Sequence, residues 1–360
     1  MPKDIEREIE SLYRKLYSEL DCFRQNNRFY SIRELMRRNA VSRRIVEKAL
    51  KRLELEGEIS IEPTCGIFVS AKRSRNSFAI ASVHCDWPAE YWVNLDSALE
   101  QEIRERHGLR FFRAFFESSS GSGYMEYLQT LQADAILLTL PPQHFSAREI
   151  AALLEWSTPV IFLENNLLCD GINAIDSQPE NSGMLAADCL IRNGHRKLAL
   201  ILSEPWSIGD NRRNEGFLNY ARLKGIDPLV IDCEVQPGEA SCAKTHEQLL
   251  IHLKKHGPDF TGCFTMSDYS ALGVISAIKE YGLRVPEDIS VIGDGGVAGS
   301  VHYSPSLTTV AHDLHGMARA IADGALELAA GGRFGIRVVP SRLIERKSVQ
   351  KYQPVTGESE

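Results

Sequence analysis

The sequence lacks any long apolar segment. No stretch approaches the roughly 20 consecutive apolar residues that a helix needs to cross a bilayer. The longest apolar runs, residues 135–140 and 198–202, have the length of strands. The first ten residues are charged, so the apolar core of a signal peptide is missing as well. We therefore expect a cytoplasmic protein that makes no membrane contact.

Paired cysteines and recognisable catalytic groups are also missing. The eight cysteines are scattered singly without a CxxC pair, so we expect free thiols that fill the core and not disulfides or a redox site. His312 and His315, and His252 and His256, have spacings that suit a metal, but the sequence shows no supporting partners around them. No Ser/His/Asp set or carboxylate pair stands out. We expect no metal, no cofactor and no enzyme activity.

The length and the charge distribution predict two unlike parts. A chain of 360 residues is too long for one ordinary core. Residues 1–75 hold 17 Lys and Arg against 12 Asp and Glu, whereas the remainder holds 24 against 36, giving −7 overall. A basic head on an acidic body concentrates the attraction for a polyanion at one end. A chance excess on a solvated surface is the alternative reading of the charge alone.

Residues 1–57 show three helical patterns. The first is a stripe of apolar residues at helical spacing, formed by Ile5, Ile9, Leu12, Leu16 and Leu20. The second begins at a Ser-x-x-Glu capping box, Ser31 and Glu34, and ends at Asn39, which tolerates the left-handed conformation. The third begins at the cap Ser42 and ends at Gly57.

Two short β-type runs, residues 58–62 and 67–69, follow the third helix and are joined by residues 63–66. Three helices and a hairpin are the layout of a winged helix, in which the third helix enters the major groove of double-stranded DNA. Arginine side chains in its first turn suit guanine edges and phosphates. The predicted DNA-binding residues are Arg33, Ser42, Arg43, Arg44, Lys48, Thr64 and Gly66. A helical interaction module that never meets DNA is the alternative.

This head resembles the GntR family of regulators. YSIREL at residues 30–35 is similar to the family's P-S-x-R-E-L, and VSRRIVEKAL at 41–50 to its recognition helix V-S-R-x-T-V-R-x-A-L. LELEG at 53–57 and GIFV at 66–69 match its L-E-x-E-G exit and G-T-F-V wing strand. The sequence departs from the pattern at Ile45, where threonine is usual, at Glu47, where an arginine often meets DNA, and at Thr64 in place of a wing glycine.

Strand-like and helix-like segments alternate through residues 78–350, after a polar, basic linker at 72–77. Strands are expected at 78–84, 109–116, 135–139, 160–163, 198–203, 229–233, 262–265 and 289–293. Helices are expected at 94–106, 124–131, 147–155, 181–193, 212–223, 243–255 and 269–281. This alternation predicts parallel sheets covered on both faces. The number of strands exceeds one standard sheet, so we infer an α/β body of two lobes that enclose a ligand at the carboxyl ends of their strands.

Six motifs in the body resemble the LacI family. The pattern D…G…A…L…GHRKLA over 176–199 is followed by RNEGF at 213–217, FTMSDYSALG at 264–273, GLRVPEDISVIG at 282–293, PSLTTV at 305–310 and LIERKS at 343–348. The resemblance implies the two-lobed fold of periplasmic sugar-binding proteins, with lobe 1 at 78–174 and 308–331, lobe 2 at 175–307 and 332–350, and a polar tail at 351–360. It also implies a homodimer. A GntR-like head, residues 1–71, on a LacI-like body is similar to the arabinose-repressor class.

A sugar site combines aromatic faces with charged groups that bridge hydroxyls. The resemblance places Arg213 at the position of the family's effector-binding arginine. It places Glu164 at a position where a carboxylate often binds the hydroxyl groups of the ligand. The predicted effector-binding residues are Asp86, Trp87, Tyr91, Trp92, Glu164, Trp206, Arg213, Asp268 and Asp294. Ser267 replaces the family's asparagine, and Gly295 stands in the place of a ligand-binding aspartate. Asp294 comes one residue early and can replace that aspartate only if the loop is rearranged.

Together these features predict a sequence-specific DNA-binding regulator, a repressor whose operator affinity a small ligand, a sugar, modulates by closing the lobes. Relief of repression is the expected sign of the response, with corepression and activation left open. The alternative is an NAD(P)-dependent or other sugar-metabolising enzyme with an accessory helical domain, because Gly293-x-Gly295-x-x-x-Gly299 follows a strand. A dinucleotide-binding loop needs a helix that begins within it, and the sequence runs on to Ser304-Pro305-Ser306 instead.

Overall fold

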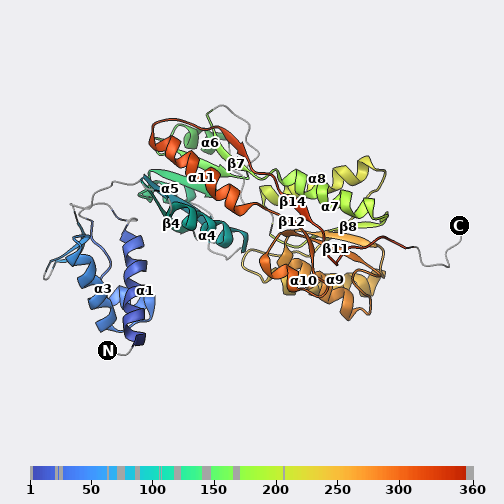
Figure 1. The fold of residues 1–360 in the computed structure, drawn as a ribbon, viewed down its shortest axis with the longest axis horizontal. Helices are drawn as coiled ribbons and strands as arrows, with labels where there is room; N and C mark the ends of the chain where they lie inside the picture. The colour runs from blue at the N-terminus through green and yellow to red at the C-terminus, as the bar shows by residue number, and fades with distance from the viewer. Residues whose placement is uncertain are drawn as a thin grey trace.

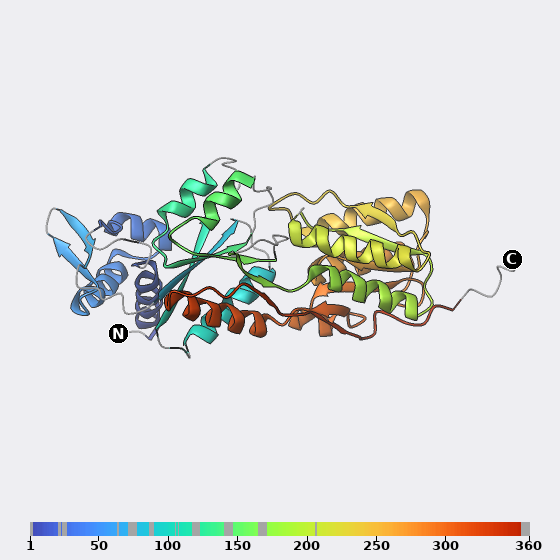
Figure 2. The same cartoon turned by 90° about the horizontal axis from the view of Figure 1, so that it is seen from above.

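The computed structural model describes residues 3–20, 23, 27–62, 65–70, 78–85, 90–104, 106, 108–116, 123–139, 147–164, 171–205 and 207–353. The head lies at one end of an elongated molecule, lobe 1 lies next to it, and lobe 2 lies at the end that carries the C-terminus (Figures 1 and 2). The linker at 72–77 and residues 354–360 of the tail fall outside the described residues.

The head contains three helices and a hairpin, as expected. They are α1 (Lys3–Glu19), α2 (Ile32–Asn39), α3 (Arg43–Leu55), β1 (Ile59–Glu62) and β2 (Gly66–Val69). β1 and β2 pair antiparallel, and an isolated bridge from Arg28 to Phe68 adds a third short segment that the sequence did not predict. The three helices and both strands share one apolar core, in which Leu16, Leu35 and Val46 are fully buried.

Local signals set the ends of these helices with one correction. Ser31 and Glu34 form the predicted capping box, in which each side chain satisfies an amide of the first turn. The left-handed residue after α2 is Ala40, with φ of 50°, and not Asn39, whose side chain donates to the carbonyl of Leu35 instead. Ser42 occupies the cap position of α3 in extended conformation, but its side chain makes no capping hydrogen bond.

Lobe 1 is a parallel sheet in the order β13-β7-β6-β5-β3-β4. Its strands are β3 (Phe78–Cys85), β4 (Leu109–Phe116), β5 (Ala135–Thr139), β6 (Val160–Leu163), β7 (Asn173–Asp176) and β13 (Ile336–Val338). Its helices are α4 (Glu90–Arg104), α5 (Tyr124–Thr130), α6 (Ala147–Leu154) and α11 (Leu314–Ala329). One apolar cluster packs α4 and α11 against the sheet, and another packs α5 and α6. Both faces are therefore covered.

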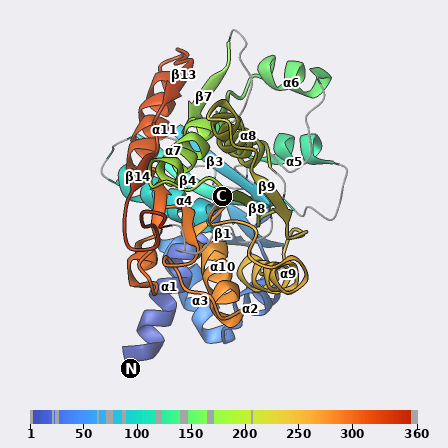
Figure 3. The ribbon, with the colours of Figure 1, turned by 90° about the vertical axis from the view of Figure 1, so that its right-hand side faces the viewer.

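Lobe 2 has the order β14-β12-β11-β10-β8-β9, in which only β14 runs antiparallel to its neighbour. Its strands are β8 (Leu198–Leu202), β9 (Leu229–Asp232), β10 (Gly262–Thr265), β11 (Ser290–Gly295), β12 (Thr308–Ala311) and β14 (Arg342–Ile344). Its helices are α7 (Pro179–Arg192), α8 (Ile208–Leu223), α9 (Ser241–His256) and α10 (Asp268–Glu280), with a 3-10 turn η3 (Ala298–His302). Figure 3 shows α7 and α8 on one side of this sheet and α9 and α10 on the other.

Helices α7 and α8 approach closely because two glycines face each other across their contact. A Cβ at Gly183 would lie 2.0 Å from the carbonyl oxygen of Arg213, and a Cβ at Gly216 would lie 2.1 Å from that of Glu180. These separations are far below van der Waals contact, so only glycine fits at either position. The close crossing sets the position of Arg213 on α8.

The chain crosses between the lobes three times, after β7, after β12 and between β13 and β14. The expected lobe boundaries need correction at the later crossings. β12 pairs with β11 and β14 and so belongs to lobe 2, and β13 pairs with β7 and so belongs to lobe 1. The sequence analysis missed four strands of three or four residues each, β7, β12, β13 and β14, and it missed α11.

Candidate functional site

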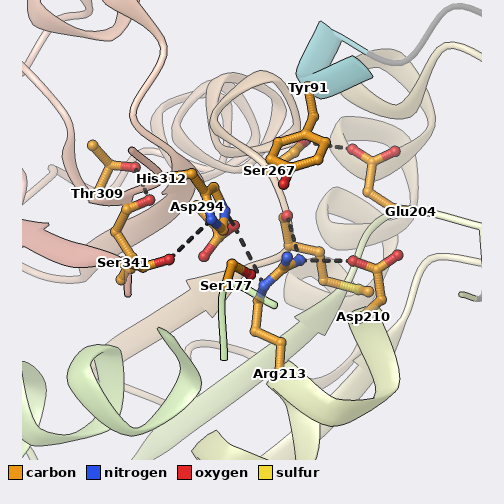
Figure 4. A network of polar contacts seen from close by, with 12 residues as sticks. Tyr91, Ser177, Glu204, Asp210, Arg213, Ser267, Asp294, Thr309, His312 and Ser341 are labelled. Carbon is orange, nitrogen blue, oxygen red and sulfur yellow. Dashed lines mark hydrogen bonds and ion pairs between the residues drawn. The ribbon is translucent and has the colours of Figure 1, made fainter. Parts of the chain in front are cut away.

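A cluster of polar side chains lies where the two lobes meet (Figure 4). Its members come from the carboxyl ends of strands in both sheets and from the three crossing segments. The carboxyl edge of parallel sheets is where ligands bind in α/β folds, since loops and helix N-termini gather there. The labelled members are Tyr91, Ser177, Glu204, Asp210, Arg213, Ser267, Asp294, Thr309, His312 and Ser341.

Arg213 is at the centre of this cluster. Its side chain is 6% exposed on α8, and Nη1 donates to Asp210 Oδ1 at 2.7 Å and to the carbonyl oxygen of Met266 at 3.3 Å. Nε lies 3.3 Å from Asp294 Oδ1, which is an ion pair but not a well-aligned hydrogen bond. Burial alone would lower the pKa of Arg213, but the charges of Asp294, Asp210 and Glu164 outweigh it and raise the pKa. The guanidinium is therefore held charged.

Asp294 connects Arg213 to two of the crossing segments. The ring Nε2 of His312, after β12, lies 2.7 Å from Asp294 Oδ1, and the ring Nδ1 lies 2.9 Å from Ser341 Oγ in the third crossing. Burial would lower the pKa of His312, but the charge and hydrogen bond of Asp294 outweigh it, so the pKa is raised. Asp294 Oδ1 is therefore shared between His312 of the second crossing and Arg213 of α8.

Glu164 contributes a carboxylate from lobe 1. It follows β6 in left-handed conformation, with φ of 48°, and accepts hydrogen bonds at Oε1 from Tyr91 at 2.8 Å and Ser177 at 2.7 Å. A Cβ at Gly209, in the first turn of α8, would lie 3.0 Å from Glu164 Oε2. Glu164 thus reaches from lobe 1 to the N-terminus of a lobe 2 helix, where the helix dipole favours a negative charge.

Two further carboxylates belong to lobe 2. Glu204, just after β8, accepts from Ser267 Oγ at 2.5 Å, and its burial raises its pKa to about 7. Asp268 accepts from Thr309 Oγ1 at 2.5 Å and from the amide of Val297 at 2.7 Å. Burial raises the pKa of Asp268 to about 7. Because both its oxygens are held by lobe 2, Asp268 orders the turn after β11.

The structure brings four predicted effector residues together: Tyr91, Glu164, Arg213 and Asp294. Asp268 lies beside them in the structural role just described. Trp92 packs edge-on against Tyr91 at 4.6 Å between ring centroids and belongs to the lobe 1 core. The remaining predicted members, Asp86, Trp87 and Trp206, lie outside the described residues.

Several members of the cluster were missed by sequence reasoning. The position of Glu204, directly after a buried strand, could have predicted it as a site residue, because the carboxyl ends of parallel strands meet at one edge of the sheet. Asp210 lies three residues before Arg213, one helical turn away, and that spacing was available too. His312 was noted only for its spacing from His315. Its contact with Asp294 joins residues 18 positions apart, which no local pattern reveals.

The glycine-rich segment after β11 does not have the geometry of a dinucleotide-binding loop. A five-residue 3-10 turn, η3, follows Gly295 and Gly296 in place of an α-helix. The phosphate-binding helix N-terminus that such a loop needs is therefore missing from this segment. Within the described residues, no group of three or more His, Cys, Asp and Glu side chains is placed to hold a metal.

A groove of about 810 Å³ lies elsewhere, on lobe 1 between α11 and β13, and is open to solvent. Its walls include Arg319, Asp323, Leu326 and Arg337. Asp323 pairs with Arg106, and Arg337 pairs with Glu327. This groove is shallow and open to solvent, and it contains none of the convergent buried groups of the cluster. We therefore place the candidate ligand site at the cluster.

The predicted DNA-binding side chains of the head gather at the start of α3 and beside it. Arg33, Ser42, Arg43, Arg44 and Lys48 are exposed, whereas Ile45, Val46 and Ala49 on the opposite face of α3 are buried. Arg43 Nε is 2.7 Å from Glu47 Oε1. Gly66 begins β2 with φ of 128°, which requires glycine, and Thr64 lies outside the described residues.

Comparison with known proteins identifies the body. Residues 187–349 match the model of the periplasmic binding protein-like domain. The lactose operon repressor of Escherichia coli K12 is 30% identical over 178 residues, which span 49% of this chain and about half, 48%, of that protein. The HTH-type transcriptional repressor PurR of Haemophilus influenzae (strain PittEE) is 26% identical over 73% of this chain and 78% of its own length.

Solved structures show the same fold. A dimeric lac repressor superposes with a TM-score of 0.67 at 22% identity, covering 76% of this chain and all of that one. A LacI family regulator from Enterococcus faecium with bound ribose superposes with a TM-score of 0.64 at 19% identity, covering 76% of this chain and 100% of that one. These identities are low enough that the likeness establishes the fold alone.

The body of this chain thus has the two-lobed α/β fold of the periplasmic binding protein-like domain. The chain is related to the LacI and PurR transcriptional repressors, and these relatives are regulators and not enzymes. In the part of the chain that the structure describes, no helix is long and apolar enough to span a membrane.

Proposed function

We propose that the protein is a DNA-binding transcriptional repressor whose affinity for its operator changes when a small polyhydroxylated ligand binds between the lobes. One observation carries this proposal: a basic, exposed helix start on the head is joined to a hinged pair of lobes with a buried polar cluster at their contact. The relatedness to known repressors supports it.

The head would act as a winged helix of the GntR type, as its motifs suggest, with α3 in the major groove. Ser42, Arg43 and Arg44 are exposed at the N-terminus of α3, where the helix dipole and unpaired amides also favour a phosphate. A GntR-like head on this body would place the protein in the arabinose-repressor class, acting in the cytoplasm on the operator.

The ligand site would use Arg213, Asp294, Glu164 and Tyr91. Arg213 and Asp294 belong to lobe 2 and Glu164 and Tyr91 to lobe 1, so a ligand that contacts both pairs stabilises one relative position of the lobes. The ligand shifts this equilibrium only by its differential affinity for the two positions. Ser177, His312 and Ser341 lie in the crossing segments and would carry the change to the hinge.

The protein would act as a homodimer that presents two heads to two half-sites. Apolar side chains are exposed on α4 and α10, where Val93, Tyr269 and Leu272 are between 38% and 53% exposed. Both helices lie on the same side of the body in Figure 1. A second copy that covers this side would remove the three side chains from water.

The test of DNA binding uses two matched arginine variants. Arg43 and Arg14 are similarly exposed, and each pairs with a glutamate one turn away, at 2.7 and 2.8 Å. Only Arg43 lies at the start of α3. We expect Arg43→Ala to weaken binding to a selected duplex by about 10- to 100-fold and to reduce the salt dependence, and Arg14→Ala to have little effect. Equal loss in both variants, measured by fluorescence anisotropy, would contradict the proposal.

A further inference from the structure

The polar cluster between the lobes carries an excess of negative charge. Its charged carboxylates near neutral pH are Glu164, Asp210 and Asp294, its cations are Arg213 and His312, and Glu204, whose pKa is about 7, adds a further acid that is largely protonated at pH 6.5. The groups are near enough to influence one another: Glu164 and Asp294 both act on the pKa of Asp210, and Asp210 acts on that of Glu204. Three charged acids share two cations, one of which is a histidine.

One carboxylate oxygen in this cluster has no partner. Asp294 is 3% exposed, and Oδ1 takes both its ion pair with Arg213 and its contact with His312. Oδ2 is buried and accepts no hydrogen bond. A buried carboxylate oxygen without a donor is costly, so such an atom marks a place that a donor from elsewhere would occupy.

Arg213 has an unpaired donor next to this unpaired acceptor. Its Nε is buried without a well-aligned acceptor, although it faces Asp294. A ligand hydroxyl could accept from Nε, and a neighbouring donor on the same ligand could satisfy Asp294 Oδ2. The two unsatisfied atoms belong to adjacent side chains, so two adjacent substituents of one small molecule would match them.

From this arrangement we propose that the ligand is a small polyol carrying a protonated amine, such as an amino sugar, with its ammonium group on Asp294 Oδ2 and a neighbouring hydroxyl on Arg213. This inference rests on the proposed function and specifies that the ligand carries a positive charge. An ammonium donates up to three hydrogen bonds and its positive charge neutralises one acid of the cluster. A neutral hydroxyl donates a single hydrogen bond and neutralises no charge. Tyr91 donates to Glu164 beside this position, and its ring packs edge-to-face with Trp92 and His312.

The same charge distribution disfavours anionic ligands. A sugar phosphate or a uronate would add a negative charge beside Glu164, Asp210 and Asp294, and Arg213 is already paired by Asp210 and Asp294 of its own lobe. Like charges in a buried site cost more than in water because the local screening is weaker. The cluster therefore discriminates by charge as well as by shape.

The experiment measures binding of matched sugars to the full-length protein by isothermal titration calorimetry at pH 6.5. The probes are D-glucosamine, D-galactosamine and D-mannosamine, each compared with its neutral parent hexose and with the corresponding uronate. We expect at least one hexosamine to bind about tenfold or more tightly than its parent, and no uronate to bind. Asp294→Asn should remove most of this preference, whereas Asp227→Asn, an exposed aspartate paired with Arg222, should leave it unchanged.

Three results would overturn the proposal: a neutral hexose that binds as tightly as its amine, a uronate that binds, or a complete lack of binding by the three amines. Glu164→Gln provides a second variant should Asp294→Asn unfold, because it removes another negative charge of the cluster, and it too should lower the preference for the amine. The proposed function is judged separately, since binding of duplex DNA and its loss in Arg43→Ala require no ligand.

Discussion

Replacing Arg213 with methionine should destabilise the body strongly, because two buried carboxylates would lose their cation. Asp210 lies 2.7 Å from Arg213 and Asp294 lies 3.3 Å from it, and neither Arg213 nor Asp294 is more than 6% exposed. Removing one partner of a buried ion pair costs about 3–5 kcal/mol when the remaining charge is left unpaired. Asp294 keeps its contact with His312, so we expect a loss at the lower end of this range. For a lobe of this size, that cost lowers the melting temperature by roughly 10 °C.

A second substitution tests the cause of this loss. Asp294→Asn removes one of the two carboxylate charges that face Arg213. The double variant Arg213→Met, Asp294→Asn should therefore be more stable than Arg213→Met alone, with a coupling free energy of about 2 kcal/mol. Differential scanning calorimetry of the four proteins measures the coupling. As a control, Arg222→Met disrupts an exposed pair with Asp227 and should cost less than about 1 kcal/mol. If the two core substitutions are additive, or Arg213→Met melts with the parent, the electrostatic account of the cluster is wrong.

Three further outcomes are expected. Glu47→Gln should tighten DNA binding a fewfold in anisotropy titrations, because Glu47 competes with the DNA phosphates for Arg43. Unchanged or weaker binding would argue against α3 as the helix that contacts DNA. Gly183→Ala should lower the free energy of unfolding by about 1–3 kcal/mol in urea titrations, since its Cβ would meet α8, whereas Gly299→Ala has open space and should cost less. The pKa values of Glu204 and Asp268 are both raised to about 7, so the folded state binds extra protons and stability falls as pH rises from 5 to 8, with Glu204 contributing up to about 3 kcal/mol. Glu204→Gln should reduce this slope and leave the part that Asp268 contributes, and an unchanged slope would show that Glu204 does not titrate in this range.

Much of the fold could be predicted from the sequence because its signals are local. The strands 109–116, 135–139, 160–163 and 262–265 agree with β4, β5, β6 and β10 at both ends. β5, β6 and β10 are short apolar runs, which is the pattern of a strand buried on both faces. β4 is an edge strand that contains Arg110 and Arg113, and its aromatic residues indicated a strand. The capping box at Ser31 and Glu34 also marks the start of α2 correctly.

The crossing segments could not be predicted in the same way. β13 and β14 contain Arg337 and Arg342 and are three residues long, so their apolar pattern is too short to distinguish from a loop. Which sheet a strand joins depends on pairing with residues far along the chain, as β13 does with β7. The lobe boundaries were therefore misplaced at these segments.

The candidate site could be predicted only in part, because several of its contacts also join residues far apart in the chain. Arg213 and Glu164 came from motif and position along the chain, whereas the geometry of Asp294 depends on the loop after β11. The sequence analysis expected Asp294 to take part only if that loop were rearranged, and its side chain lies against Arg213 and His312. His312 and Ser341 join the cluster from separate crossings, which only the assembled lobes bring together.

Selection of duplexes from a randomised DNA library by the full-length protein tests the central claim most directly. A pair of heads tied to one dimeric body predicts enrichment of an inverted repeat whose half-sites lie about one helical turn apart, and no such enrichment with Arg43→Ala. Enrichment of no motif, or of the same motif by the variant, would contradict the account.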